Sequence, residues 1–480
     1  MEGNVKMVKI GKQIEIKKPT LLYSMIALLC IIAFMACGYI FLRANFAILL
    51  FLGWLIAAAF AMGLGYKFTD IEGLAYESAK KGVAPAAIIM AVGLMIASFM
   101  AAGTVPTVLV LGLKAINPSV FLLVTFILCC ITSLITGTSW GTIGTVGVAM
   151  IGVGTGLGAN LAITAGAIVS GAYFGDKMSP ISDSTILAST MTGTELWTHI
   201  KNMLWTTIPG AVICMILYTA LGFSSSGSSY DKSVIDGVIT SINSIYHIDF
   251  LAVLPLLVDI VLIGLRASTV GSLLIGSVLA STVAVVHQGY SLKKVAGFLY
   301  SGFVVDSDNA FLTGILNRGG LTSMMSLVAM IFVALGLGGI ISETGLLQPV
   351  FEAITKGIRS AEGVLLMAWV IVWICVFIVP TYNFAFVLVP TLFNPLMKQY
   401  HLKTENLSRI LEDVGTLGGN ILPWCVGPVF ATGVLGVPTA QYWPYVFLSI
   451  LVPVISLIFI ITGFKTKFET ESVPQEEAQS

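Results

Sequence analysis

Two stretches of this sequence combine acidic and hydroxyl-bearing side chains with a helix-breaking proline. The first is YFGDKMSPISDST (residues 173–185), which contains two aspartates and a run of serines and threonine around its proline. The second is LEDVGTLGGNILPW (residues 411–424), which contains a Glu-Asp pair, a threonine and an asparagine. Carboxylate, hydroxyl and backbone carbonyl oxygens are ligands of hard cations. The two stretches therefore predict a site for a cation such as Na⁺.

The aspartates of the first stretch are the leading candidates for this chemistry. Asp183 follows the proline within SPISDST, and we expect it to bind Na⁺ together with Ser139. Asp176 lies beside Lys177, so it is either a second ligand or half of a solvated loop pair. A carboxylate in a poorly solvated place can also exchange protons. The candidate ion- and substrate-binding residues are Asp183, Asp176, Ser179, Ser182, Thr138, Ser139, Asp413, Thr416, Asn420 and Asn383.

Three other acidic positions allow two interpretations each. Asp259 lies inside the apolar run LAVLPLLVDIVLIGLR, where a bare carboxylate is usually functional, but Arg266 is two helical turns away and could pair with it. Asp306 and Asp308 form either another unwound cation-binding stretch or a plain loop. Glu412 is either part of the site or part of the charged start of a helix.

Two short motifs suggest enzymes, and both are rejected on context. Residues 137–141 fit the G-x-S-x-G nucleophile elbow, but Ser139 follows no predicted strand. The four histidines fall at the ends of apolar segments or in loops, so no base is placed to activate it. Gly154-x-Gly156-x-x-Ala159 fits a loose dinucleotide pattern but also follows no strand. No catalytic residue and no organic cofactor are predicted.

The composition is that of a polytopic membrane protein. Hydrophobic residues make up 57% of the 480 positions and charged residues 10%, whereas soluble domains are about 25% charged. The formal net charge is zero, which gives no electrostatic reason to expect a nucleic-acid partner. Five lysines precede the apolar run 21–42, which is too long for a signal-peptide core. We interpret this run as an uncleaved first span with the N-terminus in the cytoplasm.

About 10–13 membrane spans are predicted from apolar length. The expected segments are 21–42, 45–66, 84–113, 119–136, 159–175, 203–222, 250–265, 269–287, 322–341, 363–380, 383–398 and 443–463. Three stretches, 137–158, 176–195 and 408–438, are too polar or too interrupted for continuous helices. The predicted organisation is a cytoplasmic segment (1–19), a first repeat (20–222), a linker (223–249), a second repeat (250–463) and a polar tail (464–480).

The two repeats are inferred from matches at an offset of 243 residues. Thr138 falls on Thr381, and Pro180 falls on Pro423. Paired helix breaks at corresponding positions of two halves are typical of inverted-repeat transporters, whose substrate site lies between the breaks. Broken backbone survives in a membrane only where protein or a water-filled cavity satisfies its polar groups. We therefore expect an all-α fold with two inverted repeats, re-entrant hairpins and broken helices.

Several blocks resemble the NhaC family of the ion-transporter superfamily. They include GTSWGTIGTVGVAMIGVGTGLG (137–158), AGAIVSGAYFGDKMSPISDSTILAS (165–189) and LSRILEDVGTLGGNILPW (407–424), and the similarity runs from about residue 45 to 463. The family includes sodium/proton antiporters, malate–lactate antiporters and some amino-acid transporters. The resemblance implies a scaffold part, a mobile part with hairpins near 136–150 and 381–395, and elevator-like alternating access. It also makes a homodimer reasonable.

The resemblance implies an antiporter of the plasma membrane that exchanges Na⁺ for H⁺. Two departures from the family pattern fall in the expected site. TYNFAFVLVP (381–390) replaces a more polar stretch, and Cys425 follows Pro423-Trp424 where many members have asparagine. The alternative function is Na⁺- or H⁺-coupled transport of a small organic solute such as malate, lactate or an amino acid.

Overall fold

The structure is a computed structural model that describes residues 16–42, 44–115, 117–180, 182–225, 232–265, 267–305, 313, 316–317 and 319–469. The described part of the chain is predominantly helical and contains no β-strand, only an isolated bridge between Leu402 and Phe468. Eight helices are long and apolar enough to cross a membrane, or up to eleven if each of three bent pairs forms one span. The prediction of an all-α polytopic membrane protein is confirmed. Arg266, Asp306 and Asp308 lie outside the described residues.

The chain divides into two compact units. The first comprises residues 1–82 and 332–357. Its helices are α1 (Leu21–Leu42), α2 (Phe46–Gly63), α3 (Phe68–Lys80), the second part of α17 (Leu321–Glu343) and α18 (Gln348–Lys356). The indole N–H of Trp54 donates a hydrogen bond to the Val333 carbonyl at 2.7 Å. A side chain at Gly336 would overlap this indole ring, so the glycine allows α2 and α17 to pack closely.

The second unit comprises residues 83–331 and 358–480 and contains the candidate site. Its helices up to the middle of the chain are α4 (Val83–Ala101), α5 (Thr104–Ala115), η1 (Pro118–Val120), α6 (Phe121–Thr136), α7 (Ser139–Thr142), η2 (Ile143–Gly147), α8 (Val148–Gly156), α9 (Leu161–Met178), α10 (Asp183–Thr192), α11 (Leu196–Ser225) and α12 (Lys232–Ile245). The later helices are α13 (Phe250–Gly264), α14 (Thr269–Val286), α15 (Leu292–Ser301), the start of α17, α19 (Ala361–Ile378), α20 (Tyr382–Gln399), α21 (Thr404–Ile410), η3 (Leu411–Thr416), η4 (Gly419–Ile421), α22 (Val426–Leu435), α23 (Thr439–Tyr442), η5 (Trp443–Tyr445) and α24 (Phe447–Thr462).

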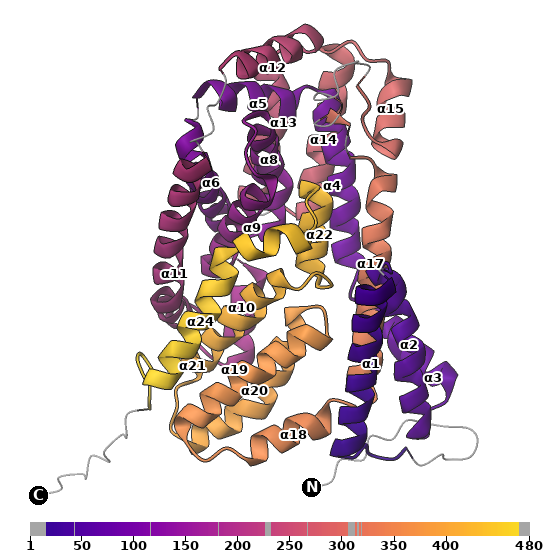
Figure 1. The fold of residues 1–480 in the computed structure, drawn as a ribbon, viewed down its shortest axis with the longest axis vertical. Coiled ribbons are helices and arrows are strands. Elements are labelled where there is room, and N and C mark those ends of the chain that lie inside the picture. The colour runs from indigo at the N-terminus through magenta and orange to yellow at the C-terminus, as the bar shows by residue number, and fades with distance from the viewer. Residues whose placement is uncertain are drawn as a thin grey trace, which may run out of the picture. The chain divides into compact units, whose positions relative to one another are not determined.

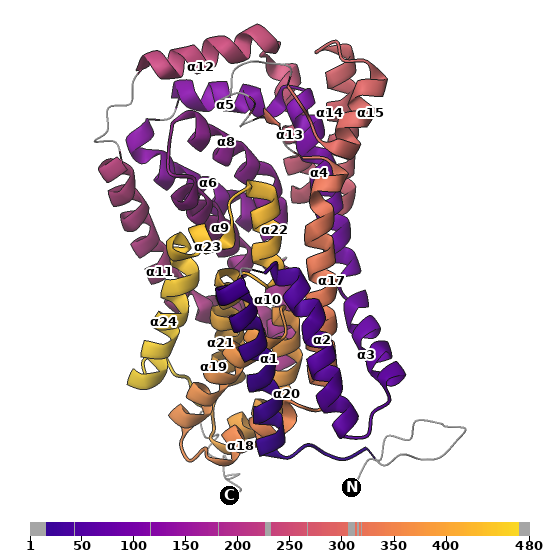
Figure 2. The ribbon, with the colours of Figure 1, turned by 45° about the vertical axis from the view of Figure 1, so that its right-hand side comes forward.

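Two helical hairpins approach the middle of this unit from opposite ends. In both views, α6 and α8 lie toward the upper end and α19 and α20 toward the lower end (Figures 1 and 2). The first hairpin turns at Gly137 and Thr138, and the second turns just before Tyr382. Thr138 and Thr381 both adopt extended backbone and cap the helix that follows with their side-chain oxygens.

The predicted interruption over 137–158 is wrong for residues 139–156, which are helical. After Thr138 the chain stays helical from Ser139 to Gly156, with a π-helical turn at η2. Two threonine hydroxyls that made this stretch look too polar bond within the helix. Thr142 Oγ1 donates to the Thr138 carbonyl at 3.0 Å and Thr145 Oγ1 to the Gly141 carbonyl at 2.7 Å. Such internal bonds remove the cost of polar side chains at membrane depth.

The predicted single segment 84–113 is also wrong, because the helix breaks at Gly103. This glycine adopts φ +76°, a left-handed conformation that other residues rarely tolerate, and it separates α4 from α5. The Ala102 carbonyl at the break accepts a hydrogen bond from Gln288 Nε2 at 3.1 Å. The freed backbone group is therefore satisfied by a residue that follows α14.

The offset of 243 residues reappears in the helix boundaries. The helical run Thr404–Ile421 begins and ends 243 residues after α9 (Leu161–Met178), and α22 begins and ends 243 residues after α10. Both short helices end at a left-handed glycine, Gly193 with φ 72° and Gly436 with φ 71°. The corresponding parts of the two halves therefore share their breaks and their helix ends.

The closest packing near the site is between α6 and α9. Gly171 and Gly175 form a G-x-x-x-G pair on α9, and a Cβ at either would overlap the backbone of α6. Small residues at this spacing let two membrane helices approach each other closely. Ser133 Oγ adds a hydrogen bond to the Ala172 carbonyl at 2.5 Å. This contact holds the first hairpin against the helix that carries Asp176.

We expect Gly175→Ala to lower the thermal stability of the detergent-solubilised protein. The added methyl group has no room against α6, and overpacking of this kind costs about 1–3 kcal/mol. Gly297→Ala is the matched control, since a Cβ at that helical position meets nothing within 4 Å. The melting temperature is the measurement, and an equal melting temperature for the two variants would contradict the proposed packing.

Candidate ion-binding site

The first group of site residues forms where α9 ends and α10 begins. Pro180 disfavours helical backbone at Ser179, which adopts φ −79° and ψ 129°, and α9 ends one residue earlier. Asp176 lies in the last turn of α9 and is 8% exposed. Its carboxylate accepts hydrogen bonds from Ser139 Oγ at 2.6 Å and from Ser182 Oγ at 2.5 Å. This cluster joins the tip of the first hairpin to both sides of the break.

The second group comes from the π-helical turn η3, where a widened helix directs Glu412 and Asp413 into the interior. Asp413 forms an ion pair with Lys177 of α9, and both side chains are fully buried. Thr206 Oγ1 of α11 donates to Asp413 Oδ1 at 2.9 Å. The ion pair therefore joins the α9 break to the corresponding region of the second half. π-Helical turns are frequent at functional sites.

Glu412 differs from its neighbour because it has no hydrogen-bond partner in the described part of the chain. The residue is fully buried, and neither carboxylate oxygen is bonded. Thr416 and Ser184 bring hydroxyl groups beside it, and Lys177 and Asp176 lie within electrostatic range. A buried carboxylate without a partner is unfavourable unless it is protonated or binds a cation. Glu412 is thus an open acidic group next to the Asp176 cluster.

The structure brings some of the predicted residues together around Asp176, whereas others are exposed. Asp176, Ser139 and Ser182 form the cluster described above. Asp183 is exposed in the first turn of α10, although it lies within electrostatic range of Asp176. Asn383 is exposed in the first turn of α20.

The remaining predicted residues have mainly local contacts. Thr138 caps α7 by accepting from the Gly141 N–H at 3.3 Å. Asn420 Nδ2 donates to the Thr416 carbonyl at 3.0 Å. The hydroxyls of Ser179 and Thr416 are buried and bond to no described residue. These two hydroxyls are free to turn their oxygen atoms toward a ligand.

The interpretation of Asp176 and Lys177 as a solvated loop pair is wrong. Both are buried, and Lys177 pairs with Asp413 across the two halves. Lys177 and Thr206 were not among the predicted site residues. The lysine could have been recognised from the sequence, because it lies in the last turn of an apolar helix, and a cation at membrane depth must have a partner.

Tyr382 is a further residue near the site, in a segment whose polar residues were considered as ligands. It begins α20, directly after the turn of the second hairpin. Asp176, Asp183 and Glu412 all lie within electrostatic range of its phenol group. The Pro380 carbonyl beside it accepts a hydrogen bond from the Val426 N–H at 3.1 Å, which ties the second hairpin to α22. The tip of each hairpin therefore contributes to the surroundings of Asp176.

Ser139 is held as a hydrogen-bond donor to a carboxylate and not as a nucleophile. The histidine buried in this unit, His199 of α11, bonds to Ser408 through Nδ1 at 2.8 Å. Among the residues that the structure describes, no three His, Cys, Asp or Glu side chains converge as they would in a transition-metal site. The donors around Asp176 are oxygens, which suit a hard cation.

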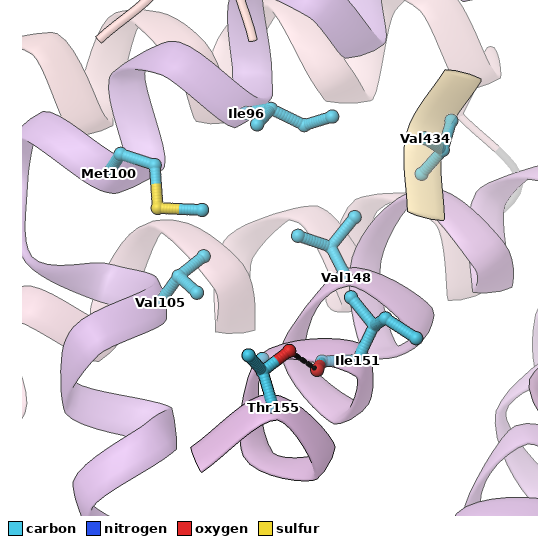
Figure 3. Close-up of a pocket in the computed structure, with 8 residues that line it drawn as sticks. Ile96, Met100, Val105, Val148, Ile151, Thr155 and Val434 are labelled. Atoms are coloured by element: carbon cyan, nitrogen blue, oxygen red, sulfur yellow. Dashed lines mark hydrogen bonds between the residues drawn. The ribbon is translucent and has the colours of Figure 1, made fainter. Parts of the chain in front are cut away.

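A small pocket elsewhere in the unit is apolar (Figure 3). Its lining residues are Ile96, Met100, Val105, Val148, Ile151, Gly152, Thr155 and Val434, from α4, α5, α8 and α22. Its only hydroxyl, on Thr155, donates to the Ile151 carbonyl at 2.7 Å. The pocket therefore offers no charged group to an ion.

Loss of one partner of the Lys177–Asp413 pair should destabilise the protein more than loss of both. Lys177→Met leaves a buried carboxylate unpaired, and breaking such a pair typically costs about 3–5 kcal/mol. The double variant Lys177→Met/Asp413→Leu removes the unpaired charge, so we expect it to recover part of the lost melting temperature. Additive losses in the two single variants and the double variant would show that the pair is not coupled.

Comparisons with known proteins agree with this arrangement. Residues 13–192 and 171–464 match the Na⁺/H⁺ antiporter family. The chain is 35% identical to the malate-2H⁺/Na⁺-lactate antiporter of Bacillus subtilis, covering 94% of this chain and 96% of that protein. It is 36% identical to the Na⁺/H⁺ antiporter NhaC of Alkalihalophilus pseudofirmus, with coverage of 93% and 96%. It is also 31% identical to the arginine/ornithine antiporter ArcD of Halobacterium salinarum, with coverage of 97% and 96%. These matches cover nearly the whole chain, including both halves of the candidate site, and the protein is therefore a multi-pass membrane protein that belongs to the Na⁺/H⁺ antiporter family.

Proposed function

We propose that this protein is a secondary active antiporter that exchanges Na⁺ for H⁺. The observation that carries the proposal is the buried Asp176 carboxylate, held by Ser139 and Ser182 at the meeting point of three helix ends. Family membership supports an antiporter, and the oxygen-rich cluster supports a cation as its cargo. The Na⁺ and H⁺ ions are the transported species.

The cluster can hold either cargo but not both at once. When Na⁺ binds to Asp176, the hydroxyls of Ser139 and Ser182 rotate so that their oxygens face the ion, as a hydroxyl is both donor and acceptor. Ser179 and Thr138 are further candidate ligands, and Asp183, at the exposed edge, attracts the ion toward the cluster. When Na⁺ leaves, the carboxylate is buried without a cation, which favours uptake of a proton.

Glu412 gives the site a second acidic group. Lys177 already balances Asp413, so the charge of Asp176 and Glu412 remains to be balanced by cargo. Thr416 and Asn420 lie on the same segment and would complete the site from the second half. Competition between one Na⁺ and protons at these carboxylates couples the two fluxes, since Na⁺ and H⁺ neutralise the same negative charges.

Alternating access is proposed to be elevator-like, with the two hairpins and the broken helices moving together. The close α6–α9 packing and the Lys177–Asp413 pair favour movement of these elements as one body. We also propose a plasma-membrane location, a cytoplasmic N-terminus and a homodimer. A reporter fused to residue 1 tests the orientation, and the mass of the detergent-solubilised protein tests the dimer.

Transport of an organic acid or an amino acid is the second candidate function, and Arg409 is the observation that favours it. This guanidinium is fully buried one turn before Asp413, and its Nε and Nη2 bond to no described residue. Its Nη1 donates to Asn202 Oδ1 at 3.2 Å. Free guanidinium nitrogens are good partners for a substrate carboxylate. The names of two relatives, which include malate, lactate, arginine and ornithine, make this class relevant.

We expect Asp176→Asn to abolish Na⁺-dependent collapse of a proton gradient in everted vesicles. The amide keeps the size of the side chain but cannot balance a cation. Asp183→Asn should retain turnover and require several-fold more Na⁺, because this aspartate is exposed and acts at a distance. Asp236→Asn, at an exposed position in α12, is the control. Full activity of Asp176→Asn in amounts of protein equal to the wild type would contradict the proposal.

The two candidate functions differ in what stabilises the purified protein. For a Na⁺/H⁺ antiporter, Na⁺ alone should raise the melting temperature in wild type and not in Asp176→Asn, since a ligand stabilises the state that it binds. For an organic-solute transporter, malate, lactate, arginine or ornithine should do so, and Arg409→Gln should remove the effect. Stabilisation by an organic solute and none by Na⁺ alone would favour the second function.

A further inference from the structure

Asp259 is a buried carboxylate that the proposed exchange at Asp176 does not use. It lies in α13, in the membrane-spanning part of the second unit, and is fully buried. Neither of its carboxylate oxygens has a hydrogen-bond partner in the described part of the chain. Its carboxyl group lies directly against Gly276 of α14, where any side chain would overlap it. The space for this carboxyl group therefore depends on a glycine in the facing helix.

The surroundings of Asp259 contain no described charge that could balance it. Helix α13 packs against α14, α5 and α6 and also contacts η2. The sequences of α14, α6 and η2 contain no Asp, Glu, Lys, Arg or His, and the single charged residue of α5, Lys114, is exposed. On the chain of α13 itself, Asp249 caps the N-terminus, nearly three turns away. Arg266, two turns after Asp259, lies outside the described residues. Among the residues that the structure describes, an ionised Asp259 has no charge to balance it, which is strongly unfavourable.

Packing alone does not account for an aspartate at this position. A buried polar side chain stabilises a fold through its hydrogen bonds, and one that makes none costs about 1–3 kcal/mol. An apolar residue of similar size would fill the space without that cost. Ionisable residues inside membrane spans are by default functional, and proton carriage is one of their usual roles.

We propose that Asp259 is a second proton-binding site, separate from the Asp176 cluster, which takes up and releases one proton in each transport cycle. The link to the cycle is α13 itself. Ile263, one turn after Asp259, lies against Gly141 in the second arm of the first hairpin. A movement of the hairpin changes the packing of α13 and with it the access of water to Asp259. The proposal rests on the proposed antiport, and it adds a proton to the number exchanged per Na⁺.

The test combines a transport measurement with one that does not depend on transport. The first compares the H⁺/Na⁺ ratio of the wild type and Asp259→Asn in proteoliposomes, from the pH gradient at which net flux stops at a fixed Na⁺ gradient and a fixed non-zero membrane potential. The second follows the infrared C=O band of protonated carboxyl groups in purified protein during a pH titration. Asp236→Asn is the control in both measurements, since that carboxylate is exposed.

We expect the ratio to fall by one proton per Na⁺ in Asp259→Asn, and one titrating C=O band to disappear. An unchanged ratio in an active variant overturns the proposal. If the wild type exchanges no Na⁺ for H⁺, the proposed antiport fails, and the infrared titration alone decides whether Asp259 binds a proton. If Asp259→Asn does not fold, Asp259→Ser replaces it, because a smaller side chain cannot overlap α14.

Discussion

The buried ion pair between Lys177 and Asp413 is the interaction on which the arrangement of the site depends. The two residues are 236 positions apart and come from corresponding regions of the two halves. Two buried charges are tolerable when they face each other and have further hydrogen bonds. Thr206 Oγ1 donates to the same Asp413 oxygen, Oδ1, that pairs with Lys177, whereas Oδ2 bonds to no described residue. The pair therefore fixes the end of α9 against η3. That contact in turn determines where Asp176 and Glu412 lie.

The same pair explains why two similar carboxylates in one π-helical turn have different roles. Asp413 is neutralised by a cation of the protein, so its charge serves the fold. Glu412 is adjacent in sequence, but its carboxylate oxygens have no hydrogen-bond partner among the described residues, and we propose that a transported cation balances its charge. The division follows from geometry, because the widened turn directs the two side chains to different neighbours. Composition alone does not distinguish a structural acid from a transporting one.

The breaks near Thr138 and at Pro180 were predictable from sequence, whereas the break at Gly103 and the partners of the charged residues were not. Pro180, Gly193 and the capping threonines act locally, so their effect on the chain can be derived from residue type and spacing. Ser139 was predicted to bind Na⁺ together with Asp183, but its hydroxyl donates to Asp176, and Asp183 is exposed. Which of two aspartates in a short loop faces inward depends on helix packing from the other half of the chain. The threonines of the first hairpin suggested an interrupted helix, but the helix is continuous because their hydroxyls bond within it.

The two halves share helix boundaries, but the charged residues of the site are not repeated between them. At the common offset, Asp176 corresponds to Gly419, Lys177 to Asn420, and Asp413 to Ser170. The two halves thus supply matching backbone but unlike charges. In a symmetric carrier the states open to either side of the membrane would be mirror equivalents with equal affinity for cargo. In the proposed alternating access, each state would place a different set of side chains between the cargo and water. The two faces of the membrane would then differ in affinity for the same cargo.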